Sequence, residues 1–259
     1  MVDLRQAQDV AVDAARRAGE IIRQGMATAR LSVCRVKAVG DVATFVDAAA
    51  ERIIRERLLA AYPDHAFVGE EQGAHGTSPC RWIVDPLDGT MNFVHGLPYF
   101  AVSVALEVEG KVRLAVVHDP VGGDVYAARE GRGAWRNGER LRVADTADLG
   151  QALVGAATPP PAWPDMADFL RRFGALCRNA AGVRRLGAAA LDLAGVASGR
   201  LDGFFMMHLA LWDVAAGGLL VTEAGGCVVP LPGVREEERA VRVVAACPGI
   251  VEALLRVLA

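Results

Sequence analysis

Helical and extended segments follow one another in a mixed order along this chain, and this order constrains the fold more than any other feature. The spacing of apolar residues predicts helices at 4–26, 44–61, 167–177, 188–197, 213–224 and 250–258. Short apolar runs between Gly and Pro residues predict strands at 66–68, 82–84, 100–106, 112–117, 203–207, 227–229 and 242–245, and hairpin strands at 125–128 and 133–135. Because strands and helices do not alternate strictly, the pattern favours a layered α+β fold.

We expect one domain over residues 1–259, with subregions at about 1–150 and 151–259. No internal repeat or low-complexity linker divides the chain. Proline interrupts both helices and strands, so a cluster of prolines marks the best boundary between the subregions. That cluster consists of Pro159, Pro160, Pro161 and Pro164.

The composition excludes several classes of protein. With 53% hydrophobic and 23% charged residues, the chain can bury a sizeable core and does not resemble a disordered protein. Its net charge of −3 offers no basic surface, so no nucleic-acid partner is expected. It has neither the ~18 uninterrupted apolar residues of a membrane span nor a secretory signal, and its five scattered cysteines favour reduced thiols. We therefore expect a cytoplasmic protein without a membrane partner.

Two carboxylates stand three residues apart at the end of the apolar run 82–84. Pro86 forces a turn between Asp85 and Asp88, and Gly89 permits close approach of the backbone. Carboxylates that share so small a space repel each other unless a cation lies between them. Mg²⁺ prefers carboxylate, carbonyl and water oxygens, so the segment predicts a magnesium site. The alternative is that both side chains only cap a turn or a helix.

Other acidic residues interrupt apolar surroundings in the same way. Glu70 and Glu71 follow the strand at 66–68, where the alternative is a solvated pair on a loop. Asp213 begins a predicted helix, where the alternative is an N-cap. Asp47 closes the pattern Thr44-Phe45-Val46-Asp47, which is typical of a capping box. A carboxylate has several lone pairs, so capping and metal binding are compatible roles.

These residues resemble the Mg²⁺-dependent, lithium-sensitive inositol monophosphatase-like phosphatases. Three motifs in register carry the resemblance: GEE at 69–71, WIVDPLDGTMNF at 82–93, and WDVAAG at 212–217 with EAGG at 223–226. The resemblance spans nearly the whole chain. It implies an alternating α-β-α-β-α layered sandwich and a homodimer.

The resemblance also implies roles for the matching residues. Glu70, Asp85 and the Leu87 carbonyl would bind a first Mg²⁺, while Asp85, Asp88 and Asp213 would bind a second. Relatives hold a third, weaker ion, to which Glu70 contributes. Thr90 and Asp47 would activate the attacking water. Glu71 would tune the position of that water. The N–H groups of Gly89 and Thr90 would bind the substrate phosphate.

One departure affects the substrate. Inositol-selective relatives carry a Glu seven residues before the second-metal Asp, and here that position is Met206. A thioether cannot bind polyol hydroxyls as a carboxylate does, so a preference for inositol is in doubt. Ala189 matches a small residue that lines the substrate pocket in relatives.

The motifs together predict a phosphomonoesterase for inositol monophosphate or a similar small polyol or sugar phosphate. Its two metal ions would stabilise both the attacking and the leaving oxygen. One alternative is a phosphatase for histidinol phosphate or fructose 1,6-bisphosphate on the same fold. An alternative of another class is a non-catalytic regulatory protein.

Overall fold

The computed structural model describes residues 2–31, 33–38, 41–158, 166–231 and 241–259. Its helices are α1 (Leu4–Gly25), α2 (Phe45–Ala61), α3 (Thr90–His95), α4 (Met166–Asn179), α5 (Ala189–Ala197), α6 (Leu211–Glu223) and α7 (Val251–Leu258), with short 3-10 helices at Met26–Leu31 and Leu149–Gln151. No helix in these ranges combines the length and the apolar character needed to cross a bilayer.

The strands form two large sheets and one hairpin. The eight-stranded sheet has the order β10-β9-β8-β7-β6-β5-β3-β4 and contains β3 (Ala66–Gly69), β4 (Gly73–His75), β5 (Cys80–Asp88), β6 (Ala101–Val108), β7 (Lys111–His118), β8 (Val125–Arg129), β9 (Ala134–Arg136) and β10 (Glu139–Arg140). The five-stranded sheet has the order β12-β11-β13-β15-β14 and contains β11 (Leu153–Ala157), β12 (Gly182–Arg184), β13 (Gly203–Leu209), β14 (Cys227–Pro230) and β15 (Val241–Ala246). An antiparallel hairpin joins β1 (Val33–Ala38) to β2 (Asp41–Thr44).

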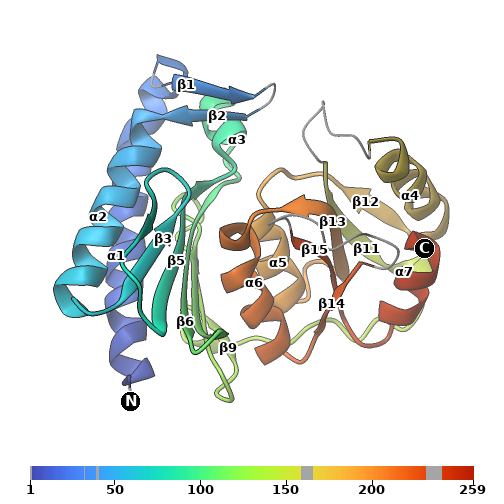
Figure 1. Cartoon of the computed structure of the whole chain (residues 1–259). Coiled ribbons are helices and arrows are strands. Elements are labelled where there is room, and N and C mark those ends of the chain that lie inside the picture. Colours follow the sequence, from blue (N-terminus) through green and yellow to red (C-terminus); the bar gives the residue numbers. More distant parts are fainter. Residues whose placement is uncertain (1, 32, 39–40, 159–165, 232–240) are drawn as a thin grey trace.

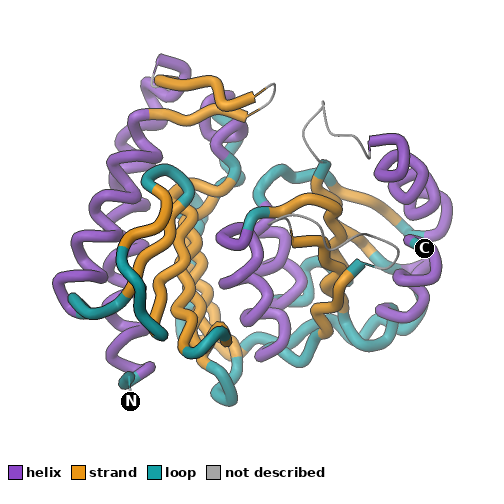
Figure 2. Tube along the Cα trace, in the orientation of Figure 1, coloured by secondary structure: helices purple, strands orange, loops and turns teal. Residues whose placement is uncertain are grey.

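These elements stack as five layers of helices and sheets (Figures 1 and 2). Helices α1 and α2 cover the outer face of the eight-stranded sheet, α5 and α6 lie between the two sheets, and α4 and α7 pack on the far side of the five-stranded sheet. Three separate hydrophobic cores fill the spaces on either side of the sheets. The alternating α-β-α-β-α sandwich and the α+β class are therefore confirmed.

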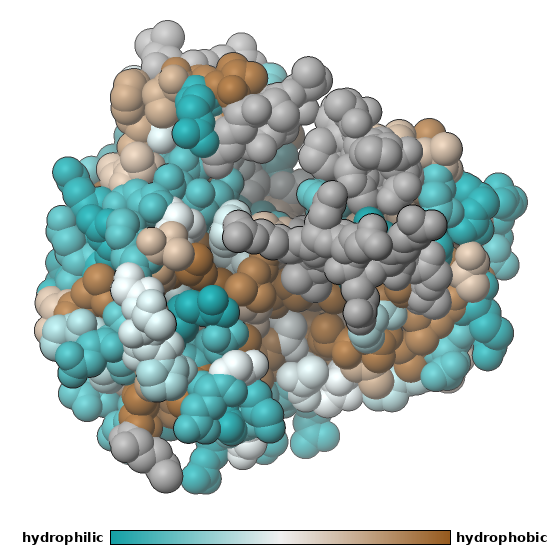
Figure 3. Space-filling view, in the orientation of Figure 1, coloured by the Kyte–Doolittle hydropathy of each residue, from teal (hydrophilic) through white to brown (hydrophobic). Residues whose placement is uncertain are grey.

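Strand β6 shows how one sheet can serve two cores. Val102, Val104 and Leu106 pack toward α1 and α2, whereas the alternate residues Ala101 and Ala105 pack toward α6. Side chains alternate between the faces of a strand, so a sheet that is covered on both sides needs apolar residues at successive positions. On the face shown in Figure 3, hydrophobic side chains gather near the middle, over α6 and β14.

Each predicted helix and strand is present, but some details differ. The helix predicted from residue 213 begins at Leu211, which makes the N-cap alternative for Asp213 wrong. The strands β1, β2, β4, β10, β11 and β12 were not predicted. The prolines at 159–164 lie outside the described residues, and β11 of the second sheet already precedes them.

Candidate active site

A pocket of about 210 Å³ lies at the carboxyl end of β5. It brings together most of the site residues that the sequence predicts. Those among its lining residues are Glu70, Asp85, Leu87, Asp88, Gly89, Thr90 and Asp213. They come from the ends of β3 and β5, the start of α3 and the first turn of α6, so four separate elements build one site.

A bulge in β5 lets Asp85 and Asp88 share this pocket. Residues three apart in a regular strand point to opposite faces of the sheet. Here Asp85 pairs with Ser103 and Asp88 pairs with Ala101, so β5 carries one more residue than β6 over this stretch. The extra residue brings both carboxyls to the same side. Pro86 suits this position because it has no N–H to donate to the sheet.

The Asp88 carboxyl is held by the start of α5. Its Oδ2 accepts the N–H of Ala190 at 2.7 Å, in the first turn of that helix. Gly89 follows with a left-handed backbone (φ 89°), where a Cβ would also press on Ala188, Tyr99 and Gly187. A residue with a side chain is strained in this conformation, so the glycine is required between β5 and α3.

Asp213 reaches the site because α6 is fixed against β6. The Ser103 hydroxyl donates to the carbonyl of Trp212 at 3.1 Å, opposite Asp85 in the sheet. Asp213 lies in the first turn of α6, where its Oδ2 accepts the N–H of Ala210 at 2.8 Å. A carboxylate is favoured there by the dipole of the helix.

The buried carboxyls interact strongly with one another. Burial is the main cause that raises the pKa of Asp85 well above its usual value, followed by the charges of Glu70, Asp88 and Asp213. Burial likewise raises the pKa of Asp213, with contributions from Asp88 and Glu70. The pocket therefore favours binding of positive charge.

Thr90 and Asp47 meet beside this pocket. The Thr90 hydroxyl lies 3.0 Å from Oδ1 of Asp47 and 2.9 Å from the Leu87 carbonyl. The capping box of α2 is present, since Oδ2 of Asp47 accepts the Thr44 N–H at 2.9 Å and also the Thr44 hydroxyl. Burial is the main cause that raises the pKa of Asp47 to about 6. Asp47 thus caps a helix and still offers one oxygen to Thr90, while its role in activating water stays a prediction.

Comparison with known proteins agrees with this geometry. The model of the inositol monophosphatase family matches residues 3–257. The chain belongs to the inositol monophosphatase family. It is 42% identical over 248 residues to the Nus factor SuhB of Salmonella typhimurium. This match covers 95% of this chain and 93% of the relative. It is 44% identical over 225 residues to an inositol-1-monophosphatase of Rhizobium meliloti. This match covers 84% of this chain and 83% of the relative.

A solved structure of the same kind superposes closely. The extragenic suppressor protein suhB from Bartonella henselae matches with a TM-score of 0.91 and 38% identity, over 98% of each chain. The two proteins therefore share the five-layer arrangement throughout.

Besides Asp47, which lies behind Thr90, three predicted residues of this inositol monophosphatase family member do not line the pocket. Ala189 is buried at the start of α5, and Met206 is buried in the core on β13. Glu71 does not line the pocket either, and its backbone N–H donates to Glu51. The predicted roles of the three in binding substrate or water stay predictions.

Other residues position the site and were not predicted from the sequence. Ser103 and Glu51 fix two of the elements that carry carboxyls. Asn92 donates to the carbonyls of Tyr99 and Leu186, at 2.7 and 2.8 Å, and so ties α3 to the loop before α5. A polar residue among the apolar residues on one face of a helix is the signal that could have identified Asn92 and Glu51.

The donor set fits the Mg²⁺ ions on which this family generally depends. Carboxylate and carbonyl oxygens are the ligands that hard divalent cations prefer, and the pocket offers four carboxyls beside the Leu87 carbonyl. Within the described ranges, no three His, Cys, Asp or Glu side chains are already grouped as a metal cage. The carboxyls instead line the walls of one pocket, where their mutual repulsion favours cations.

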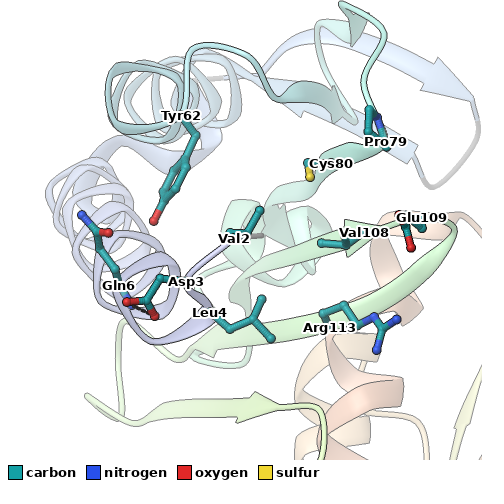
Figure 4. A pocket seen from close by; sticks show the side chains of 10 residues that line it. All are labelled: Val2, Asp3, Leu4, Gln6, Tyr62, Pro79, Cys80, Val108, Glu109 and Arg113. Atoms are coloured by element: carbon teal, nitrogen blue, oxygen red, sulfur yellow. Dashed lines mark hydrogen bonds between the residues drawn. The ribbon is translucent and has the colours of Figure 1, made fainter.

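A larger cavity of about 910 Å³ lies at the other end of β5, next to Cys80 (Figure 4). Val2, Leu4 and Val108 give it an apolar lining, and none of the predicted site residues lies there. The location of the acidic groups, and not the size of the cavity, therefore identifies the candidate active site.

Asp192 provides a test of how burial affects carboxyls near this site. It accepts the Tyr99 hydroxyl at 2.8 Å, and its other oxygen is buried without a partner among the described residues. Burial is the main cause that raises the pKa of Asp192 to about 7, above the value of about 4 in an unfolded chain. The folded state therefore binds this proton more tightly than the unfolded chain does. The contribution of Asp192 to stability is fully present below about pH 4 and is lost as the pH rises through 7.

We expect Asp192→Asn to stabilise the metal-free protein at pH 8 and to change little at pH 4. The gain at pH 8 is on the order of a few kcal/mol in the free energy of unfolding, at about 1.4 kcal/mol for each pKa unit. Urea unfolding in EDTA at several pH values measures it. A difference between the variant and the wild type that does not change with pH would contradict the expected titration.

Proposed function

We propose that this protein is a Mg²⁺-dependent phosphomonoesterase that hydrolyses a small polyol or sugar phosphate. The observation that carries the proposal is the convergence of four carboxyls and the Leu87 carbonyl on one pocket, beside the glycine that opens α3. Glu70, Asp85 and the Leu87 carbonyl would hold one ion, and Asp85, Asp88 and Asp213 a second. When bound, Mg²⁺ supplies activation of water and neutralisation of charge on the phosphate and the leaving oxygen.

Thr90 and Asp47 would handle the proton of the attacking water. The Thr90 hydroxyl accepts a hydrogen bond from the water and donates its own proton toward Oδ1 of Asp47, which lies 3.0 Å away. Because the pKa of Asp47 is raised to about 6, the carboxylate is a stronger base than an exposed Asp and is still ionised at neutral pH.

The start of α3 would bind the phosphate. The first N–H groups of a helix have no partner within it, and they favour anions. Gly89 has no side chain there, so the backbone stays open to the substrate oxygens. Gly89 and Thr90, which both line the pocket, would therefore supply the donors to the phosphate.

The class of substrate is supported by one named relative and opposed by one residue. A relative at 44% identity is named inositol-1-monophosphatase. Met206 stands where inositol-selective relatives carry Glu, and it lies in the core instead of on the pocket wall. A panel of myo-inositol 1-phosphate, histidinol phosphate and fructose 1,6-bisphosphate tests the choice. A rate on inositol phosphate no better than that on histidinol phosphate overturns the inositol assignment.

We expect phosphate release to require Mg²⁺ and to fall in millimolar Li⁺. The second cation position consists of hard oxygen donors only, where Li⁺ can replace Mg²⁺. Phosphate release is measured with Mg²⁺, with EDTA, and with Mg²⁺ plus increasing LiCl, using NaCl at equal ionic strength as the control. Turnover that EDTA leaves undiminished would exclude the proposed use of the metal.

A regulatory function is the second candidate, because several relatives at 41–45% identity are named Nus factor SuhB. That name makes a transcriptional role of this chain a proposal alongside catalysis, and it qualifies the expectation of no nucleic-acid partner. Homodimer formation and a cytoplasmic location remain predictions, and sedimentation in solution tests the first of them.

A further inference from the structure

Glu51 lies on α2 one turn after Asp47, and it is completely buried. A buried carboxyl group costs stability unless hydrogen bonds compensate it, and an apolar side chain of similar size would avoid that cost. The reason for a glutamate at this position must therefore lie in what its two oxygens hold.

Both oxygens hold the loop that carries Glu70. Oε2 accepts the N–H of Glu71 and Oε1 accepts the N–H of Gln72, each at 2.8 Å. These residues belong to the turn between β3 and β4, where Gly69 pairs with Gly73. A Cβ on Gly69 would overlap Oε2 of Glu51, so the glycine makes room for the carboxyl.

The same turn is also tied to β5. The N–H of Glu70 donates to the carbonyl of Val84 at 3.3 Å, directly before Asp85. The turn is thus held from one side by the backbone of β5 and from the other side by Glu51. Glu70 is the residue between these two attachments, and its side chain lines the acidic pocket.

We propose that Glu51 is a positioning residue that fixes Glu70 for binding of the divalent cation. Helix α2 then supports both halves of the site, since Asp47 holds Thr90 and Glu51 holds the Glu70 loop. This inference rests on the proposed function for the identity of the cation. It needs no contact between Glu51 and the metal or the substrate.

Glu51→Gln tests the proposal because the amide of Gln has one acceptor oxygen, whereas the N–H groups of Glu71 and Gln72 need two. We expect the Mg²⁺ dissociation constant to rise about 10- to 100-fold, the range found when groups behind a ligand are lost. We expect kcat at saturating Mg²⁺ to change much less. Amide hydrogen exchange should accelerate at least about tenfold at whichever of Glu71 and Gln72 faces the new NH2 group, because that N–H loses its buried acceptor.

Two variants make the result specific. Glu51→Asp keeps both oxygens on a shorter side chain and should fall between wild type and Glu51→Gln, which preserves the test if Glu51→Gln does not fold. Ile54→Val removes a methylene from a buried residue on the same helix and should lower the unfolding temperature without changing Mg²⁺ binding.

Isothermal titration calorimetry and hydrogen exchange give readouts that do not depend on turnover. Wild-type Mg²⁺ affinity in a folded Glu51→Gln variant overturns the positioning role, whatever happens to exchange in the loop. If the wild type hydrolyses no phosphate ester but Glu51→Gln still weakens Mg²⁺ binding, the proposed function fails and the positioning role stands.

Discussion

Replacing Asp88 with Asn is expected to lower phosphatase activity about 1000-fold while the protein stays folded. Such a loss corresponds to about 4 kcal/mol of transition-state stabilisation, which is within the range that a metal supplies. In the wild type the Ala190 N–H donates to Asp88 at 2.7 Å. The amide oxygen of Asn can still accept this N–H, so the start of α5 keeps its attachment. Burial raises the pKa of Asp88 to about 7, so a neutral side chain suits this environment. Initial rates at saturating Mg²⁺ and thermal unfolding measure the two expectations.

Asp192→Asn is the matched control for this variant. Asp192 is also a buried carboxyl with a pKa raised to about 7, but it does not line the acidic pocket. The phosphatase activity of the Asp192→Asn enzyme should stay within about tenfold of that of the wild type. An Asp88→Asn enzyme as active as the Asp192→Asn enzyme would remove Asp88 from the metal site. An inactive Asp88→Asn chain that still supports every cellular phenotype would favour the regulatory function.

Replacing Thr90 with Val is expected to lower kcat by about 10²- to 10⁴-fold, the usual contribution of a positioned proton-transfer group. Val has nearly the shape of Thr, but it loses the hydroxyl that lies 3.0 Å from Asp47 and 2.9 Å from the Leu87 carbonyl. The Mg²⁺ dissociation constant should change little, because the four carboxyls remain. Steady-state kinetics and calorimetry on the same preparation separate the two effects.

Thr90→Ser keeps the hydroxyl and should recover most of the rate. The kcat of the wild type should also fall as the pH drops below about 6, when Asp47 takes up a proton and can no longer accept one. A Thr90→Val enzyme within tenfold of wild type would show that water is activated without this residue.

The sequence predicted local structure well wherever one segment contains its own signal. The capping box at Thr44 and Asp47 was recognised because both partners belong to the same helix turn. The strand at 153–157 was missed because the segment Leu153-Val154-Gly155-Ala156-Ala157 combines glycine with alanine, which favour strands poorly. Its place inside a sheet comes from parallel pairing with β12 and β13.

The site shows a similar limit. The motif around Asp85 and Asp88 could be interpreted from the residues alone, since Pro86 and Gly89 lie within it. The approach of Asp213 to Asp85 depends on the bond from Ser103 to Trp212, which no local pattern encodes. Resemblance to a family supplied that pairing, and the structure supplied its physical cause. The alternative that Asp213 is an N-cap was wrong because helix α6 starts two residues earlier.

The origin of the carboxyls in two halves of the chain affects how the protein matures. Asp85 and Asp88 lie on β5 of the first sheet and Glu70 lies in the turn after β3, whereas Asp213 belongs to a helix between both sheets. A nascent chain that has emerged only as far as β10 can offer three acidic groups but not the fourth. Tight capture of magnesium should thus come late in synthesis, and the ion would then favour the fully assembled molecule over partly built ones.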